Sequence, residues 1–413
     1  MSISSSPPPS VNSVRPADDA EIVPPTLTRP NRPFASNNAG ANAKADSGSA
    51  GEAAPDSAAE LLRSTLEAVA PGTELRGALE RIARGRTGAL IVLGFDPVVE
   101  SISSGGFELD VPFSATRLRE LAKMDGAVVI DFDRQRIVRA AVQLLPDPSI
   151  PTSEAGTRHR TAERVAKQTG FPVISVSQSM NIAALYVHDI RHVLLDPEEL
   201  AARASQALVT LERYRARLEE LSANLTALEV EDQATAREVA SVAGSQEVVW
   251  RIGQEVADVL TELGTAGRLL RMQFEQAIAG VEQERRLLVR DYAGAEAHPG
   301  TGGAERALAA LAALPISALI EADKVALALG LVDSPTVIDS AMTPRGYRLL
   351  AAVPGLDGQT AERIVARFGS LQAILGAALE DLVGVPGLDR TRARAIREGL
   401  SRIAETATLG RFV

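Results

Sequence analysis

The sequence of 413 residues contains no cysteine. This absence excludes a disulfide framework and any thiolate zinc site, and it permits a reducing compartment such as the cytoplasm. The chain also lacks any apolar run near the roughly 20 residues that span a bilayer, and residues 1–10 lack the apolar core of a signal peptide. We therefore expect a cytoplasmic protein with no membrane partner.

Lysine is scarce too, and acidic residues outnumber basic ones, 53 to 43. The net charge is −10, and lysine occurs only four times, at Lys44, Lys123, Lys167 and Lys324. A chain of this charge is unsuited to coating nucleic acid by bulk electrostatics. Any contact with nucleic acid must therefore be local.

The pattern along the chain predicts a multidomain protein. Residues 1–55 are rich in Pro, Ser, Ala, Asn and Gly, which predicts a disordered tail. Residues 56–196 combine helical patterns at 58–69, 74–83 and 160–168 with apolar strand-like segments, which predicts an α/β layer domain. The strand-like segments are 88–94, 127–131, 136–144, 172–177 and 182–187.

Residues 197–342 and 343–413 have a different, helical character. Apolar residues from Leu211 to Leu228 follow steps of three and four, which predicts an all-α spine packed as a bundle or coiled coil. The alternative is an ordinary core-facing stripe that only spaces domains or assembles subunits. In the last segment, Val353-Pro354-Gly355-Leu356 recurs 32 residues later as Val385-Pro386-Gly387-Leu388. Each copy predicts a helix, a tight turn and a second helix.

This repeat resembles tandem helix-hairpin-helix motifs, which bind the DNA backbone through main-chain N–H groups. Residues 341–413 hold ten arginines and seven acidic residues, a basic segment on an acidic chain. Asp357 and Asp389 stand where such hairpins usually have a second glycine, so we expect them to restrict the turn and disfavour a phosphate. A helical domain with only a packing role is the alternative. The candidate DNA-binding residues are Gly355, Leu356, Gly358, Gly387, Leu388, Arg390 and Arg392.

The residues best suited to chemistry form the block from Gly156 to Arg164, which places Arg-His-Arg at the start of a predicted helix. Arginine forks match phosphate oxygens, and a helix N-terminus attracts anions. The alternatives to a phosphate-binding role are structural. Arg158 and Arg160 could form exposed ion pairs with Glu163 or Glu154. Thr157 or Thr161 could serve only as an N-cap. We expect His188, His192 and His298 to be structural or exposed.

Upstream, Lys123-Met124-Asp125-Gly126-Ala127 precedes a predicted strand. An ionised aspartate there can hold a divalent metal or accept a proton from a sugar hydroxyl, although Asp-Gly is most often merely a turn. Lys-x-Asp-Gly also resembles the DNA ligase motif. The few lysines and the absence of cysteine argue against a ligase.

Together with Val-Ile-Ser-Val-Ser-Gln-Ser at 173–179, these motifs resemble the diadenylate cyclase family. With the helical middle and the hairpin repeat, the architecture is similar to the family's DNA integrity scanning branch. The resemblance implies a mixed central sheet flanked by helices, and condensation of two ATP into the second messenger cyclic di-AMP with release of two pyrophosphates. Asp125 would bind Mg²⁺ or Mn²⁺ and assist the 3′-hydroxyl. The implied ATP-binding residues are Asp125, Gly126, Ala127, Thr157, Arg158, His159, Arg160, Thr161 and Ser177.

The resemblance also implies partners. Each protomer binds one ATP and faces a second protomer, and the family forms homo-octamers. Branched or damaged DNA held by the C-terminal hairpins is expected to lower synthesis through the spine. The alternative is a non-catalytic DNA-binding scaffold with a degenerate nucleotide pocket.

Overall fold

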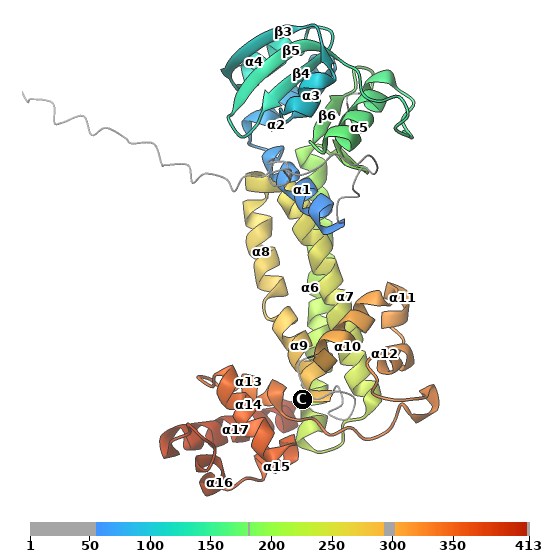
Figure 1. Cartoon of the computed structure of the whole chain (residues 1–413). Helices are drawn as coiled ribbons and strands as arrows, with labels where there is room; N and C mark the ends of the chain where they lie inside the picture. Colours follow the sequence, from blue (N-terminus) through green and yellow to red (C-terminus); the bar gives the residue numbers. More distant parts are fainter. Residues whose placement is uncertain (1–54, 181, 293–301, 411–413) are drawn as a thin grey trace, which may run out of the picture.

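The computed structural model describes residues 55–180, 182–292 and 302–410. The predicted tail at 1–55 therefore lies outside the described residues except for Pro55, which begins the first helix; His298 lies outside them as well. An α/β domain stands at one end of a helical spine, and an all-α domain stands at the other (Figure 1).

An eight-stranded mixed sheet forms the centre of the α/β domain. Its order is β2-β5-β4-β1-β6-β7-β8, with β3 also pairing with β5, and β1 and β4 are its one parallel pair among the described strands. The strands are β1 (Ala89–Leu93), β2 (Ser103–Ser104), β3 (Phe107–Pro112), β4 (Ala127–Asp131), β5 (Arg136–Leu144), β6 (Val173–Val176), β7 (Ala183–Val187) and β8 (Ile190–Leu194).

Helices cover both faces of this sheet. Along β1, Ile91 and Leu93 pack with α1 (Pro55–Ala68), α2 (Glu74–Arg84) and α4 (Ala115–Leu121). The alternate residues Leu90 and Val92 pack with α3 (Pro97–Ser101) and α5 (Thr157–Thr169). Because successive side chains point to opposite faces, a continuous apolar run fits a strand buried on both sides. The predicted fold class, a mixed sheet flanked by helices, is confirmed.

The spine is built on two long antiparallel helices, α6 (Pro197–Val230) and α7 (Ala236–Leu263). With 34 residues, α6 extends about 50 Å. Leu211, Leu218 and Leu225 of the predicted seam are at most 1% exposed. In the part of the chain that the structure describes, no helix has the length and apolar character of a membrane span.

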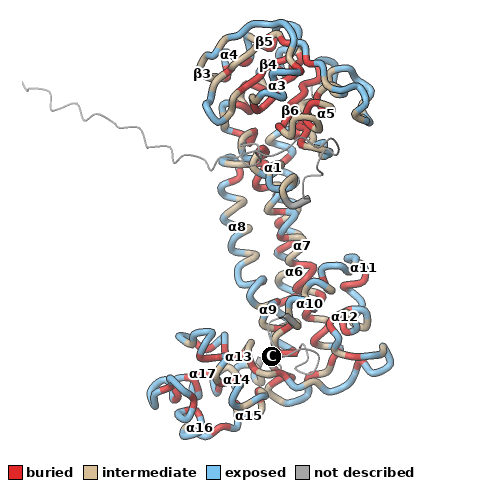
Figure 2. Tube along the Cα trace, viewed as in Figure 1, coloured by how far each residue is buried: buried red, intermediate tan, exposed pale blue. Residues whose placement is uncertain are grey.

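Shorter helices pack along the spine. They are η1 (Gly264–Gly267), α8 (Arg268–Ile278), α9 (Val281–Tyr292), α10 (Gly302–Ala313), α11 (Ile316–Leu319), α12 (Ala322–Ala328) and η2 (Pro335–Val337). In Figure 2, α8 shows no buried residue, whereas α6 and α7 alternate between buried and exposed positions. The paired long helices therefore form the core of the spine.

The α/β domain is fastened to the upper end of the spine by polar contacts. His192 Nε2 on β8 lies 3.0 Å from Glu262 Oε2 on α7. Thr265 Oγ1 on η1 donates to the carbonyl of Pro71, which follows α1, over 3.3 Å. His192, expected to be structural or exposed, thus has a structural role.

The all-α domain contains the two predicted hairpins. Helices α13 (Tyr347–Ala351) and α14 (Gly358–Phe368) form the first, and α16 (Leu379–Val383) and α17 (Arg390–Gly410) form the second, with α15 (Leu371–Leu375) between them. Leu350, Ile364 and Ile396 are among the buried residues of their shared core. The repeat therefore folds as one packed unit.

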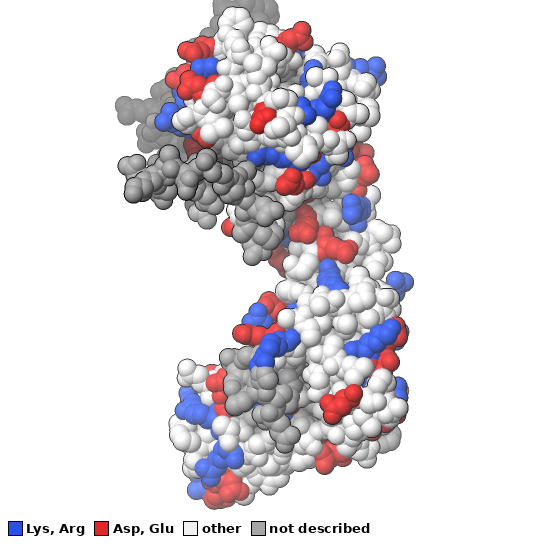
Figure 3. Space-filling view, turned by 45° about the vertical axis from the view of Figure 1, so that its right-hand side comes forward, with Lys and Arg blue, Asp and Glu red and all other residues white. Residues whose placement is uncertain are grey.

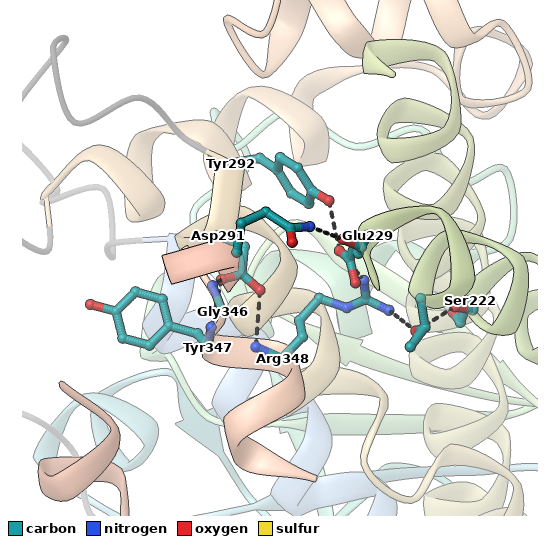
Figure 4. Close-up of polar contacts among 9 residues, drawn as sticks. Ser222, Glu229, Asp291, Tyr292, Gly346, Tyr347 and Arg348 are labelled. Carbon is teal, nitrogen blue, oxygen red and sulfur yellow. Dashed lines mark hydrogen bonds and ion pairs between the residues drawn. The ribbon is translucent and has the colours of Figure 1, made fainter. Parts of the chain in front are cut away.

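A buried polar cluster joins this unit to the lower end of the spine (Figure 4). Glu229 Oε1 accepts hydrogen bonds from Tyr292 Oη and Arg348 Nη1, each over 2.6 Å. Asp291 accepts from the backbone N–H groups of residues 346, 347 and 348 over 2.6–2.9 Å. Burial raises the pKa of Asp291 to about 6 despite these bonds. The joint combines buried charges with backbone capping.

Candidate active site

The predicted site residues meet at one edge of the sheet. Ile91 of β1 pairs with Val128 of β4, and Ala89 pairs with Val176 of β6. Continuing both registers to the end of β1 brings Asp125, Gly88 and Ser177 to the same edge. Residues from three segments far apart in the sequence thus lie together because of strand pairing.

Gly126 fixes how Asp125 enters this edge. Its φ is +103°, and a Cβ there would stand 2.7–2.9 Å from backbone atoms of Ala141 and Val142. A side chain would therefore be strained and would push β4 away from β5. Ala127 is fully buried in the sheet core, so it can contribute to an adenosine site only through its main chain. Asp125 itself is exposed.

Helix α5 begins next to this edge. A Cβ on Gly88 would stand 2.8 Å from Arg158 Nη1, so the Arg158 guanidinium lies directly over the start of β1. The N-cap residue is Gly156. The N-cap alternative for Thr157 and Thr161 is therefore wrong: Thr157 is the first helical residue, and Thr161 Oγ1 donates to its carbonyl over 3.0 Å.

The alternative that Arg158 and Arg160 form ion pairs with Glu163 or Glu154 is also wrong. Glu163 pairs with Lys167 over 2.9 Å, and Glu154 pairs with Arg191 over 2.7 Å. Neither Arg158 nor Arg160 has an acidic partner among the described residues. The two guanidinium groups are thus free for an anionic ligand.

His159 points into a hydrogen-bonded chain. Its Nδ1 lies 2.9 Å from Tyr186 Oη, and that hydroxyl donates to Glu154 Oε1 over 2.8 Å. Burial lowers the pKa of His159, the charge of Glu154 opposes this, and Arg191 and Arg158 add to the lowering. Burial raises the pKa of Tyr186, which keeps its hydroxyl protonated.

Ser177 closes the edge on the β6 side. It is 8% exposed, and its Oγ accepts from the backbone N–H of Met180 over 3.3 Å. This hydroxyl is positioned by a turn that follows β6 rather than by the strand itself. It lies at the edge of the sheet but is mostly covered.

Asp125 is the one predicted metal ligand at this edge. Within the described ranges, no three His, Asp or Glu side chains come together as a metal site. Mg²⁺ commonly uses one or two carboxylates plus substrate phosphates. The exposed Asp125 beside free arginines fits such a shared metal.

The sequence did not single out Tyr186, Glu154 or Arg191 as site residues. Tyr186 lies on β7, 27 positions after His159, and only the pairing of β6 with β7 brings it under α5. The sequence does offer one indication: a tyrosine within an apolar strand is expected to be buried, and a buried hydroxyl needs a polar partner. The identity of that partner was not predictable.

The hairpin turns hold the second set of predicted residues. Gly355 and Gly387 have φ values of +78° and +84°, which explains the Pro-Gly turn in each copy. Leu388 is buried in the hairpin core, so it can meet DNA only through its main chain, whereas Leu356 is half-buried against the same core. Gly358, Arg390 and Arg392 are exposed.

The expectation that Asp357 and Asp389 restrict these turns is wrong. Asp357 has a φ of −80° and caps α14, accepting from the N–H of Thr360 over 2.9 Å. Asp389 accepts from the N–H of Arg392 over 2.7 Å. Each aspartate thus satisfies the N-terminus of the second hairpin helix.

Charge on the surface is mixed. On the face drawn in Figure 3, side chains of both signs are interspersed, with no extended region of one sign. Two arginines of α14 are engaged internally: Arg363 Nη1 and Arg367 Nη1 donate to the carbonyls of Pro386 and Gly384, each over 2.7 Å. The exposed arginines of α17 remain as the local basic residues.

Comparison with known proteins defines the class. Family models match residues 76–190 as "DisA bacterial checkpoint controller nucleotide-binding", 194–337 as "DisA bacterial checkpoint controller linker region" and 347–402 as "SAM-like Helix-hairpin-helix tandem". The fold and the site therefore define a diadenylate cyclase joined by a helical linker to tandem helix-hairpin-helix motifs.

Curated relatives narrow this further. The chain is 58% identical over 354 residues to the DNA integrity scanning protein DisA of Kineococcus radiotolerans, covering 86% of this chain and 98% of that protein. It is 55% identical over 353 residues to the protein of the same name from Streptomyces coelicolor, covering 86% and 94%. The chain belongs to the DisA family.

Proposed function

We propose that this diadenylate cyclase condenses two ATP molecules into cyclic di-AMP and releases two pyrophosphates. The observation that carries the proposal is the meeting of the exposed Asp125 with Arg158 at one sheet edge, beside the start of α5. The arginines Arg158 and Arg160, which lack acidic partners among the described residues, suit a triphosphate.

The residues have distinct roles in this proposal. Asp125 assists removal of the proton from the attacking 3′-hydroxyl, while Gly126 brings backbone close to the adenosine. Thr157, Arg158, His159, Arg160 and Thr161 hold the triphosphate, and the hydroxyl of Ser177 lines the phosphate region. Phosphoryl-type transfer depends mostly on such positioning and on neutralising oxygen charge.

A divalent metal, Mg²⁺ or Mn²⁺, would be held by Asp125 together with substrate phosphates. When bound, it would polarise the phosphate and lower the pKa of the attacking hydroxyl. The lack of a three-ligand cluster among the described residues supports a metal that arrives with the nucleotide rather than a resident ion.

The site is proposed to be half of a larger one. Asp125, Thr157 and Arg160 are all exposed, so one protomer does not enclose the nucleotide. A facing copy would supply the second ATP and exclude water. We therefore propose an even-numbered homo-oligomer, with an octamer expected, which light scattering would test.

We further propose that the hairpin domain binds branched or damaged DNA and lowers synthesis. The two positive-φ glycine turns and the exposed Arg390 and Arg392 support backbone contacts. The buried joint of Figure 4 supports transmission to the spine, because it allows little independent movement of the hairpins. Cyclase rates with a four-way junction and with linear duplex test this, and equal rates contradict it.

The enzyme proposal is tested by incubating the protein with ATP and Mn²⁺ and identifying products by mass spectrometry. Wild type and Asp133→Asn, an exposed aspartate of the same domain, are expected to form cyclic di-AMP, and Asp125→Asn is not. No product from an assembled, metal-loaded wild type would instead favour the non-catalytic DNA-binding scaffold.

A further inference from the structure

Four side chains form a polar chain beneath the start of α5. Tyr186 Oη lies 2.9 Å from His159 Nδ1 and 2.8 Å from Glu154 Oε1. Arg191 Nε lies 2.7 Å from the same oxygen of Glu154. Tyr186 is 1% exposed, so its hydroxyl is enclosed between its partners. None of these three neighbours of His159 belongs to the motifs that identify the site.

The direction of the hydrogen bonds follows from the donor inventory. An ionised Glu154 only accepts, so the single hydroxyl proton of Tyr186 goes to it. The Tyr186 oxygen then accepts, and His159 must carry a proton on Nδ1. Neutral and protonated His159 thus differ only at Nε2, the other ring nitrogen.

The orientation of the ring places that second nitrogen near the proposed phosphate site. His159 Cδ2, the carbon bonded to Nε2, lies 3.4 Å from the position of a Cβ on Gly156, the N-cap of α5. The ring edge that is not bound to Tyr186 therefore faces the helix N-terminus. Arg158, the neighbouring residue, lies over Gly88 at the same end.

We propose that Tyr186, Glu154 and Arg191 are positioning residues that hold His159 with its Nε2 toward the triphosphate, and that the charge of Glu154 favours protonation of His159 when the nucleotide binds. Arg191 holds the carboxylate of Glu154, and Glu154 orients the Tyr186 hydroxyl. The chain conveys the negative charge of Glu154 toward the ring. This inference rests on the proposed nucleotide site and adds a regulatory property to it.

The charges around His159 make binding pH-dependent. The groups facing it are Glu154, Tyr186, Arg158 and Arg191, and burial with the two arginines lowers its pKa while Glu154 opposes this. A neutral Nε2 accepts hydrogen bonds and does not donate to a phosphate oxygen. Triphosphate binding therefore takes up a proton near neutral pH, and affinity falls as pH rises.

The test measures binding of 3′-deoxy-ATP, which lacks the attacking hydroxyl, by titration calorimetry in two buffers of different ionisation enthalpy. Wild type is expected to take up protons on binding. Tyr186→Phe keeps the ring but removes the relay, so proton uptake should disappear and the affinity at neutral pH should fall about tenfold, the scale of a hydrogen bond to a charged group. Glu154→Gln should reduce uptake in the same direction.

The outcomes separate the two hypotheses. Unchanged affinity and proton uptake in Tyr186→Phe, with tight binding to wild type, would overturn the relay and leave the nucleotide site standing. Absence of binding to wild type would overturn the nucleotide site and the relay with it. Thermal melting of Tyr186→Phe checks that the sheet remains folded, and a lower affinity with unchanged proton uptake would indicate only a packing role.

Discussion

The joint between spine and hairpins is the place where a single substitution should have the largest effect on stability. Arg348→Ala would remove the cation that faces Glu229, whose side chain is fully buried. Tyr292 would remain as a hydrogen-bond donor, but a hydroxyl does not neutralise the charge. The second oxygen, Glu229 Oε2, has no hydrogen-bond partner in the described part of the chain.

The magnitude follows from the burial of the pair. Removing one member of a buried ion pair costs about 3–5 kcal/mol, because the other charge is left uncompensated. The paired variant Glu229→Gln with Arg348→Met removes both charges and should recover most of that loss. Arg397→Ala, an exposed arginine of the same domain, should change stability by less than about 0.5 kcal/mol.

The assay is urea denaturation combined with hydrogen exchange of the hairpin helices. Arg348→Ala should lower the free energy of unfolding of this domain and speed exchange in α14 and α17. A loss below about 1 kcal/mol, or a double variant no more stable than Arg348→Ala, would refute the claim that this buried pair holds the joint.

Three further predictions concern the edge, the hairpins and the joint. Gly126→Ala should lower the rate of product formation about a hundredfold, because the new Cβ would displace Asp125. Gly105→Ala is the control: Gly105 also has a positive φ, +65°, but nothing lies within 4 Å of its Cβ position, so the rate should stay within about twofold of wild type. Equal rates in the two variants would contradict the steric argument. Asp357→Ala should lower the free energy of unfolding, measured in urea, by about 1 kcal/mol, and Asp357→Gly should lower it by only a few tenths of a kcal/mol. Identical losses in the two variants would argue against a capping role for Asp357. The folded-state pKa of Asp291 is raised to about 6, so between about pH 4 and pH 6 the folded state binds a proton that the unfolded state has lost. The free energy of unfolding of the wild type should therefore fall as pH rises from about 4 to about 6, by up to about 1.4 kcal/mol per pH unit. Asp291→Asn should reduce this dependence of stability on pH, measured as urea midpoints between about pH 4 and pH 6. An unchanged dependence would show that another group causes it.

The sequence predicted the elements whose apolar pattern is strong. The bounds predicted for 127–131 and 136–144 match β4 and β5. The first four residues of β4 are buried and apolar, whereas β5 mixes buried apolar positions with half-buried and exposed ones. The strands β3 and β8 were missed. In β3 apolar and polar residues do alternate, so that strand was recognisable, whereas β8 is short and has no regular alternation. The short strand β2 and the short helices α3 and α4 were missed as well, since few residues carry their signal.

The candidate site shows the same division. Asp125 and the Arg-His-Arg block were found because motif spacing marks them, but their proximity depends on the register of β1 with β4. Glu229 and Arg348 are 119 positions apart, and no local pattern predicts their contact. Asp357 was recognisable, since an aspartate three residues before a helical N–H is a common N-cap, yet it was interpreted only as a missing glycine.

The central claim is that the edge around Asp125 and Arg158 joins two ATP molecules. The most direct measurement supplies equal amounts of unlabelled and uniformly ¹³C-labelled ATP with Mn²⁺ and resolves the products by mass spectrometry. The account predicts cyclic di-AMP in which the half-labelled species is about as abundant as the unlabelled and fully labelled species together, as random pairing of two nucleotides requires. Products containing a single nucleotide, or ATP left unconsumed, would contradict it.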